Sequence, residues 1–191
     1  YGSQQPWVMS DTIRNNILFF KNFEPEKYRK VISICQLEHD LELLAYGDQT
    51  EINSTSSNVS GGQKARISLA RCLYKDADLY LIDDPFSSID NKVGNKIFKG
   101  AFCEYLKDKA RILITNELAN LSYVDKIIYM EKGKIIFSGN YKEFNDKFGT
   151  KNLVDTDNEN KYDEQEKSVR NYIRKSSKIG RAVQQECRDR Y

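Results

Sequence analysis

Apolar residues near the start of the chain follow the spacing of an amphipathic helix. Pro25 lies at the start of this pattern, where proline is compatible with a first helical turn. The apolar positions are Tyr28, Val31, Ile32, Cys35, Leu37, Leu41 and Leu44. The pattern predicts one continuous apolar stripe, then a polar loop over residues 47–58, and a second helix that starts at Ser60.

Two short apolar runs farther along the chain predict strands. They span residues 79–82 and 112–115, and an amphipathic stretch over residues 91–107 separates them. A right-handed crossover would make the strands parallel and bring their carboxyl ends to one rim of the sheet, where ligands of open α/β sheets bind. We therefore expect the chemistry of the protein near Asp83 and Thr115.

The last part of the chain divides into a predicted hairpin and a polar tail. Residues 126–130 and 134–138 flank the turn Glu131-Lys132-Gly133, which predicts two strands. Residues 150–191 are mostly polar and charged, as in a solvated linker. Arg174-Lys175-Ser176-Ser177 matches a basophilic phosphorylation pattern, which is also frequent in such linkers.

Composition argues against several classes of protein. The formal charge is only +2, from 30 basic and 28 acidic residues, so charge does not favour a nucleic-acid partner. The apolar runs are far shorter than the ~20 residues of a membrane-spanning helix. The four cysteines are far apart and lack a Cys-x-x-Cys pair, which is typical of reduced thiols rather than a disulfide framework or zinc site.

Two motifs indicate phosphate chemistry. Val59-Ser60-Gly61-Gly62-Gln63 opens the second predicted helix with a Ser-x-x-Gln capping box, and its glycines let an anion approach the helix N-terminus. Residues 78–85, with the sequence Asp-Leu-Tyr-Leu-Ile-Asp-Asp-Pro, form an apolar strand that ends in Asp83, a candidate magnesium ligand. Each motif alone is common in proteins, but the pair at this spacing is not.

Together these stretches resemble the ATP-binding cassette (ABC) transporter family. Residues 59–63 match its Leu-Ser-Gly-Gly-Gln signature, residues 78–85 its Walker B strand, and residues 87–90 its D-loop. Ser3-Gln4-Gln5-Pro6-Trp7 resembles the Q-loop, with Gln4 as its glutamine, and the resemblance extends to about residue 144. Residues 7–19 and 78–85 resemble the first cassette of subfamily C, the multidrug-resistance-associated group that includes the cystic fibrosis chloride channel.

The resemblance implies an α/β fold, a partial P-loop NTPase (RecA-like) core with the ABC helical subdomain, followed by a flexible charged tail. The nucleotide-binding domain would span residues 1–149, with the helical subdomain at about 6–75 and the Walker B, D-loop and switch part at about 76–149. The tail would span residues 150–191. The sequence has no Gly-x-x-x-x-Gly-Lys-Ser/Thr loop and begins within a motif, so we expect the C-terminal part of a cassette that is inactive alone.

In this family, two cassettes form a head-to-tail sandwich at the cytosolic face of a membrane. The resemblance implies that the signature of this chain completes the ATP site of the second cassette, and that the Q-loop region contacts the transmembrane domains. It assigns magnesium binding to Asp83 and Gln4. Nucleotide contacts are assigned to Ser60, Gly61, Gly62, Gln63 and Asp90.

The chain's own site departs from the family pattern. Asp84 replaces the glutamate base, and Asn116 replaces the switch histidine. Loss of a positioned base typically lowers the rate by about 10²- to 10⁴-fold, so hydrolysis there should be slow or absent. The only histidine, His39, is expected on the surface. Residues 53–57 also differ from the Gly-Glu-x-Gly stretch that precedes the family's signature.

Two other classes of function share parts of this pattern with a transporter motor. An ATP-gated module, as in a channel-type member, would need no hydrolysis at this site. Chromosome-organising clamp ATPases share the signature and Walker B motifs but insert long coiled coils between Q-loop and signature. Gln4 and Ser60 are joined here by a short segment without heptads, which argues against the clamp class.

Overall fold

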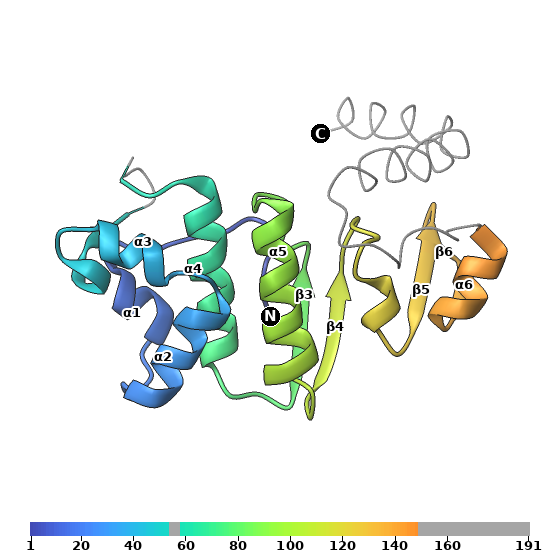
Figure 1. Ribbon diagram of the computed structural model, residues 1–191, viewed down its shortest axis with the longest axis horizontal. Coiled ribbons are helices and arrows are strands. Elements are labelled where there is room, and N and C mark those ends of the chain that lie inside the picture. The colour runs from blue at the N-terminus through green and yellow to red at the C-terminus, as the bar shows by residue number, and fades with distance from the viewer. Residues whose placement is uncertain (54–57, 149–191) are drawn as a thin grey trace. The chain divides into compact units, whose positions relative to one another are not determined.

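The computed structural model describes residues 1–53 and 58–148 (Figure 1). The chain forms two compact units, Tyr1–Asn116 and Glu117–Tyr191. The predicted tail, including the phosphorylation pattern at Ser176, lies outside the described residues, as do residues 54–57 of the segment before the signature.

The first unit begins with a helical part. Its helices are α1 (Ile13–Leu18), α2 (Pro25–Ile34), α3 (Glu38–Leu43) and α4 (Gly61–Tyr74), and Pro25 occupies the first turn of α2 as predicted. Two short strands, β1 (Asp11–Thr12) and β2 (Glu51–Ile52), pair antiparallel, and the 3-10 helix η1 (Gly47–Gln49) precedes β2.

The prediction of one continuous stripe from Tyr28 to Leu44 was wrong beyond Cys35. Gln36 has a φ of 53°, in the left-handed region, and α2 ends there. The amide of Leu37 donates to Ile32 O at 3.1 Å and that of Gln36 to Ser33 O at 3.0 Å, the bond pattern of a Schellman motif. Leu37 is buried in this cap, and α3 starts in a new helical register.

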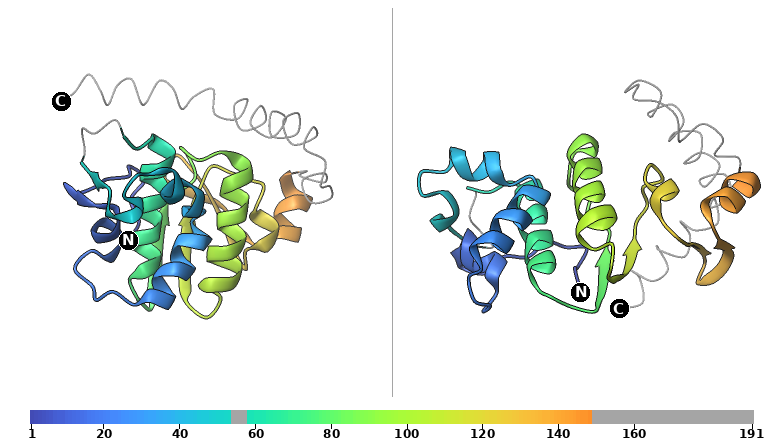
Figure 2. Two further views of the ribbon diagram at one scale, coloured as in Figure 1. Left: turned by 60° about the vertical axis from the view of Figure 1, so that its left-hand side comes forward. Right: turned by 60° about the horizontal axis from the view of Figure 1, so that its bottom comes forward.

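The apolar face of α4 forms the core of this helical part. Ile67, Leu73 and Tyr74 are each at most 1% exposed, and they pack among buried residues of α1 and α2 such as Ile17 and Val31. Figure 1 and both views of Figure 2 show α2 beside α4. Burial of each such side chain stabilises the fold by about 1.5–3 kcal/mol. The predicted helix starting at Ser60 is therefore confirmed, with its N-terminus free of the core.

A strand-helix-strand unit follows, as predicted. Strands β3 (Leu79–Asp83) and β4 (Ala110–Ile114) are parallel, and Asp83 is paired with Ile114 at their carboxyl ends. The helix α5 (Asn91–Phe98) continues into a π-helical segment, η2 (Lys99–Tyr105), and Phe98 and Phe102 stack at 5.3 Å between ring centroids. Tyr80 and Ile82 of β3 are buried, which leaves the alternate side chains of this strand on the other face of the sheet.

The second unit contains the predicted hairpin. Strands β5 (Ile127–Glu131) and β6 (Lys134–Gly139) are antiparallel, and α6 (Tyr141–Phe148) follows the 3-10 helix η3 (Leu121–Tyr123) and the hairpin in the chain. Lys132 and Gly133 have φ values of 49° and 73°, as a type I′ turn requires at both central positions. The ring of Phe144 packs against Tyr129 and Phe137, which joins α6 to both strands. No helix in the described part of the chain has the length and apolarity to span a bilayer.

Candidate functional site

The N-terminus of α4 has the geometry that its sequence predicts. Ser60 is the N-cap, and its Oγ accepts a hydrogen bond from the amide of Gln63 at 3.2 Å. In return, Gln63 Oε1 accepts from the amide of Ser60 at 2.7 Å, which completes the capping box. The amide of Lys64 donates to Ser60 O at 2.9 Å. The amides of Gly61 and Gly62 precede this first helical bond, so neither has an intrahelical acceptor.

The two glycines of the motif have different surroundings. A Cβ atom at Gly61 would meet no atom within 4 Å, so this position faces open space. A Cβ atom at Gly62 would lie 3.0 Å from Ser88 O. Gly62 therefore permits the close approach of residues 87–90 to the start of α4, whereas Gly61 is available to a ligand or a partner.

The carboxyl end of β3 presents two adjacent aspartates. Asp83 is half-buried, and Asp84 is 7% exposed. Asp84 has a φ of 41°, a left-handed conformation that aspartate tolerates better than most residues, and its amide donates to Ile114 O at 2.7 Å. Ser87 Oγ donates to Asp84 O at 3.2 Å and closes the turn that follows. The local backbone thus directs the two neighbouring carboxylates differently.

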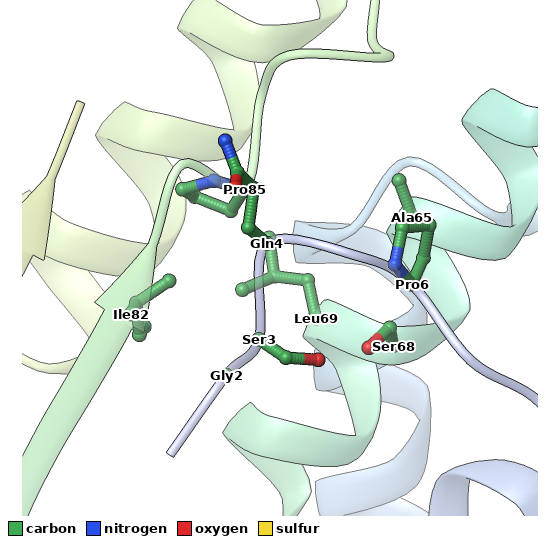
Figure 3. A pocket seen from close by; sticks show the side chains of 9 residues that line it. All are labelled: Gly2, Ser3, Gln4, Pro6, Ala65, Ser68, Leu69, Ile82 and Pro85. Atoms are coloured by element: carbon green, nitrogen blue, oxygen red, sulfur yellow. The ribbon is translucent and has the colours of Figure 1, made fainter. Parts of the chain in front are cut away.

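Gln4 lies beside these aspartates although it is about eighty positions away in the chain. Gly2 pairs with β3 on the edge opposite β4: its amide donates to Leu81 O at 2.7 Å, and the amide of Asp83 donates to Gly2 O at 2.9 Å. Gln4 Nε2 then donates to Asp84 Oδ2 at 3.3 Å. Figure 3 shows this N-terminal segment between Ile82 of β3 and Ser68 of α4, in a small pocket that all three elements line.

The two remaining predicted site residues lie at exposed positions. Asp90 is the N-cap of α5, and its Oδ1 accepts from the amides of Lys92 at 2.9 Å and Val93 at 3.4 Å. Asn116 follows the end of β4 by two residues. Because β3 and β4 are parallel and in register, Asn116 is near the same rim as Asp83.

Comparison with known proteins identifies the family. Residues 2–87 match the family model of the ABC transporter domain. The chain is 48% identical over 144 residues to the human ATP-binding cassette sub-family C member 4. This alignment covers 75% of this chain and 11% of that protein. The chain belongs to the ABC transporter family.

Further relatives are also ABC transporters. The chain is 46% identical over 142 residues to ABC transporter C family member 8 of Dictyostelium discoideum, covering 73% of this chain and 9% of the relative. It is 45% identical over 144 residues to the vacuolar heme ABC transmembrane exporter abc3 of Schizosaccharomyces pombe, and this alignment covers 74% of this chain and 10% of the relative. The chain thus spans about a tenth of the length of these relatives.

The cassette residues fit the oxygen chemistry of a magnesium ion. ABC transporter domains bind ATP, usually with Mg²⁺, which prefers oxygen ligands and keeps several waters. Asp83 offers a carboxylate at the rim, and the exposed Gln4 offers an amide oxygen while its nitrogen is bonded to Asp84. These two residues would hold the ion, together with water and phosphate oxygens.

Arg71 is an interior residue of the cassette that the sequence patterns did not single out. It is 8% exposed; its Nε donates to Asn16 O at 2.6 Å, and its Nη1 donates to Trp7 O at 3.0 Å. Burial lowers the pKa of this guanidinium to about 10. Its Cζ lies 3.8 Å from the ring centroid of Trp7. The signal available in the sequence was an arginine on the apolar face of an amphipathic helix.

An aromatic patch lies next to Arg71 on the surface of this cassette. Trp7, Phe19 and Phe20 are 44%, 39% and 88% exposed. The ring centroid of Phe19 lies 5.6 Å from that of Trp7 and 5.1 Å from that of Phe20. Phe19 and Phe20 both have positive φ values, of 43° and 65°. Phe19 is the left-handed C-cap of α1, and contiguous exposed aromatic side chains are typical of an interaction surface rather than of a core.

Proposed function

We propose that this chain is part of the first nucleotide-binding domain of a subfamily C ABC transporter, which couples ATP binding and hydrolysis to transmembrane transport of a solute. Its core would be RecA-like, and residues 6–75 would form the ABC helical subdomain. The observation that carries the proposal is the open, capped turn at Gly61, together with Asp83 and Gln4 at the rim of the sheet. In a transporter these would serve two different nucleotides.

The signature would serve the nucleotide of the second cassette. The amides of Gly61 and Gly62 have no intrahelical acceptor, and the positive end of the α4 dipole adds to their attraction for a phosphate. Open space at Gly61 leaves room for a phosphate to approach the backbone. The chain's own residues therefore bind and orient a partner-held nucleotide without supplying a nucleophile or base to it.

The chain's own site would be degenerate. Asp84 is nearly buried and accepts a hydrogen bond from Gln4, and its side chain is one methylene shorter than the glutamate base of hydrolytic cassettes. Asn116 cannot act as the acid-base group that a histidine would be. These observations also favour a second candidate, an ATP-gated regulatory module in which ATP holds the cassettes together and this site does not turn over.

The aromatic patch of Trp7, Phe19 and Phe20 would contact the transmembrane domains. Trp7 follows Gln4 by three residues, and Arg71 of α4 binds both Trp7 O of the patch and Asn16 O of α1. This contact would place the domain at the cytosolic face of a membrane.

A cysteine cross-link tests the sandwich geometry. In the full-length protein, Gly61→Cys paired with a cysteine in the phosphate-binding loop of the second cassette should form a disulfide whose yield rises with ATP. Glu38→Cys, at an exposed position of the same unit, is the control and should not respond to ATP. Equal cross-linking by both variants, with and without ATP, would contradict the proposed role of the signature.

A further inference from the structure

Asp40 of α3 binds two side chains of the signature helix. Its Oδ1 accepts a hydrogen bond from Gln63 Nε2 at 2.8 Å, and its Oδ2 lies 2.6 Å from Arg66 Nη1. The side chains of Asp40 and Arg66 are only 18% and 15% exposed, so this ion pair is partly shielded from water. Each carboxylate oxygen of Asp40 therefore binds a different side chain of α4: Oδ1 binds Gln63 and Oδ2 binds Arg66.

The same two side chains, Gln63 and Arg66, also bind the backbone of the signature. Gln63 Oε1 accepts from the amide of Ser60 at 2.7 Å, and Arg66 Nε donates to Gly62 O at 3.4 Å. Arg66 also donates to Gln36 O, at the left-handed end of α2. A continuous set of polar contacts thus leads from Asp40 to the residues on both sides of Gly61.

We propose that Asp40 is a positioning residue for the signature, acting through Gln63 and Arg66 to hold the amides of Gly61 and Gly62 in the orientation that a phosphate needs. This inference rests on the proposed role of the signature at the partner's nucleotide. It also changes the role of Gln63, because both Oε1 and Nε2 of its side-chain amide are bonded within the chain.

The chemistry of the contact makes asparagine the informative substitution. Gln63 Nε2 and Arg66 Nη1 are both donors, so the site needs an acceptor at each oxygen of residue 40. Asp40→Asn keeps the shape but places an NH₂ group opposite one of those donors. Glu38→Gln is the matched control, because it neutralises a carboxylate of the same helix at an exposed position.

The test measures ATP hydrolysis by the full-length protein as a function of ATP concentration. Asp40→Asn should lower kcat/KM by about 10- to 100-fold, the effect of losing one charge-assisted hydrogen bond that orients a binding group. Glu38→Gln should match the wild type. Both variants should still fold, and the loss of kcat/KM in Asp40→Asn should exceed any loss of folded protein, which is all that a purely structural role of Asp40 would produce.

A second variant covers the case in which Asp40→Asn fails to fold. Arg66→Lys keeps the charge beside Asp40 but cannot bind Asp40 and Gly62 O together, so kcat/KM should fall several-fold in a folded protein. Wild-type kinetics in either folded variant would overturn the proposal. Gly61→Asp distinguishes a failure of the proposed function from a failure of the role of Asp40. If Gly61→Asp leaves hydrolysis intact, the proposed function fails. If it stops hydrolysis while Asp40→Asn behaves as Glu38→Gln, only the role of Asp40 fails.

Discussion

Replacing Gly61 by aspartate places a carboxylate where the proposed partner nucleotide would approach α4. The chain itself should accept this change. A Cβ atom at Gly61 meets no atom within 4 Å, and an acidic residue in the first turn of a helix interacts favourably with the helix dipole. A loss of turnover in this variant would therefore report on the nucleotide rather than on folding.

The expected size of the loss follows from Coulomb's law. A carboxylate about 5 Å from a γ-phosphate oxygen, at an effective dielectric constant of about 20, is repelled by about 3 kcal/mol per unit of phosphate charge. This repulsion corresponds to about 100-fold weaker binding of the nucleotide in the closed sandwich. Gly61→Ala is the matched control, because it adds the Cβ atom without the charge and should retain more activity.

The opposite expectation holds for Asp84→Asn. Asparagine has the same shape and tolerates the left-handed φ of 41°, so only the charge of the degenerate base position is lost. Turnover should fall far less than in Gly61→Asp when steady-state hydrolysis by both variants is measured in the same membrane preparation. If Asp84→Asn stopped hydrolysis as completely as Gly61→Asp, with folding and nucleotide binding intact, Asp84 would be a working base and the asymmetric interpretation would be rejected.

Three further predictions concern this chain alone. It should bind ATP only weakly in calorimetry, because its sequence lacks the Gly-x-x-x-x-Gly-Lys-Ser/Thr loop that cradles phosphates, and micromolar affinity would contradict the Q-loop assignment of Gln4. Leu73→Ala should lower the free energy of unfolding by about 2–5 kcal/mol in chemical denaturation, since Leu73 is fully buried on α4, the helix that packs against α1 and α2. Ser60→Ala should cost about 1 kcal/mol in the same assay by removing the cap of α4, whereas no change would mean that the capping box is not formed in solution.

Local patterns predicted the parts of the fold whose interactions are close in sequence. The capping box needs only Ser60 and Gln63, three residues apart, and the hairpin turn needs only Lys132 and Gly133. The parallel pairing of β3 and β4 was predictable because two strands joined through a helical crossover run in the same direction. The positions of Asp83 and Asp84 at the rim follow directly from that pairing.

The end of α2 was not predictable in the same way. Gln36 adopts the left-handed conformation at the helix cap, where glycine or asparagine is the usual signal, and its apolar neighbours kept the helical spacing. The burial of Leu37 in the cap stabilises a break that residue preferences alone do not favour. Tertiary packing decided the local structure here.

Contacts between distant residues were also outside the reach of sequence patterns. Asp40 and Gln63 are 23 positions apart, and Arg71 and Asn16 are 55 apart. In the sequence, Asp40 and Arg66 are ordinary charges on helix surfaces. Tertiary structure brings these residues together: side chains of α3 and α4 meet at Asp40, and α1 packs against α4 beside Arg71.

Both sets of distant contacts are made by α4, and they lie at opposite ends of that helix. The contacts to Asp40 lie in its first turns, and the contacts of Arg71 to Trp7 and Asn16 lie in its last turn. Fourteen helical residues span about 21 Å, and backbone hydrogen bonds join their successive turns. One helix therefore connects the aromatic patch, bound through Arg71, with the signature, whose first turns are bound by Asp40 of α3.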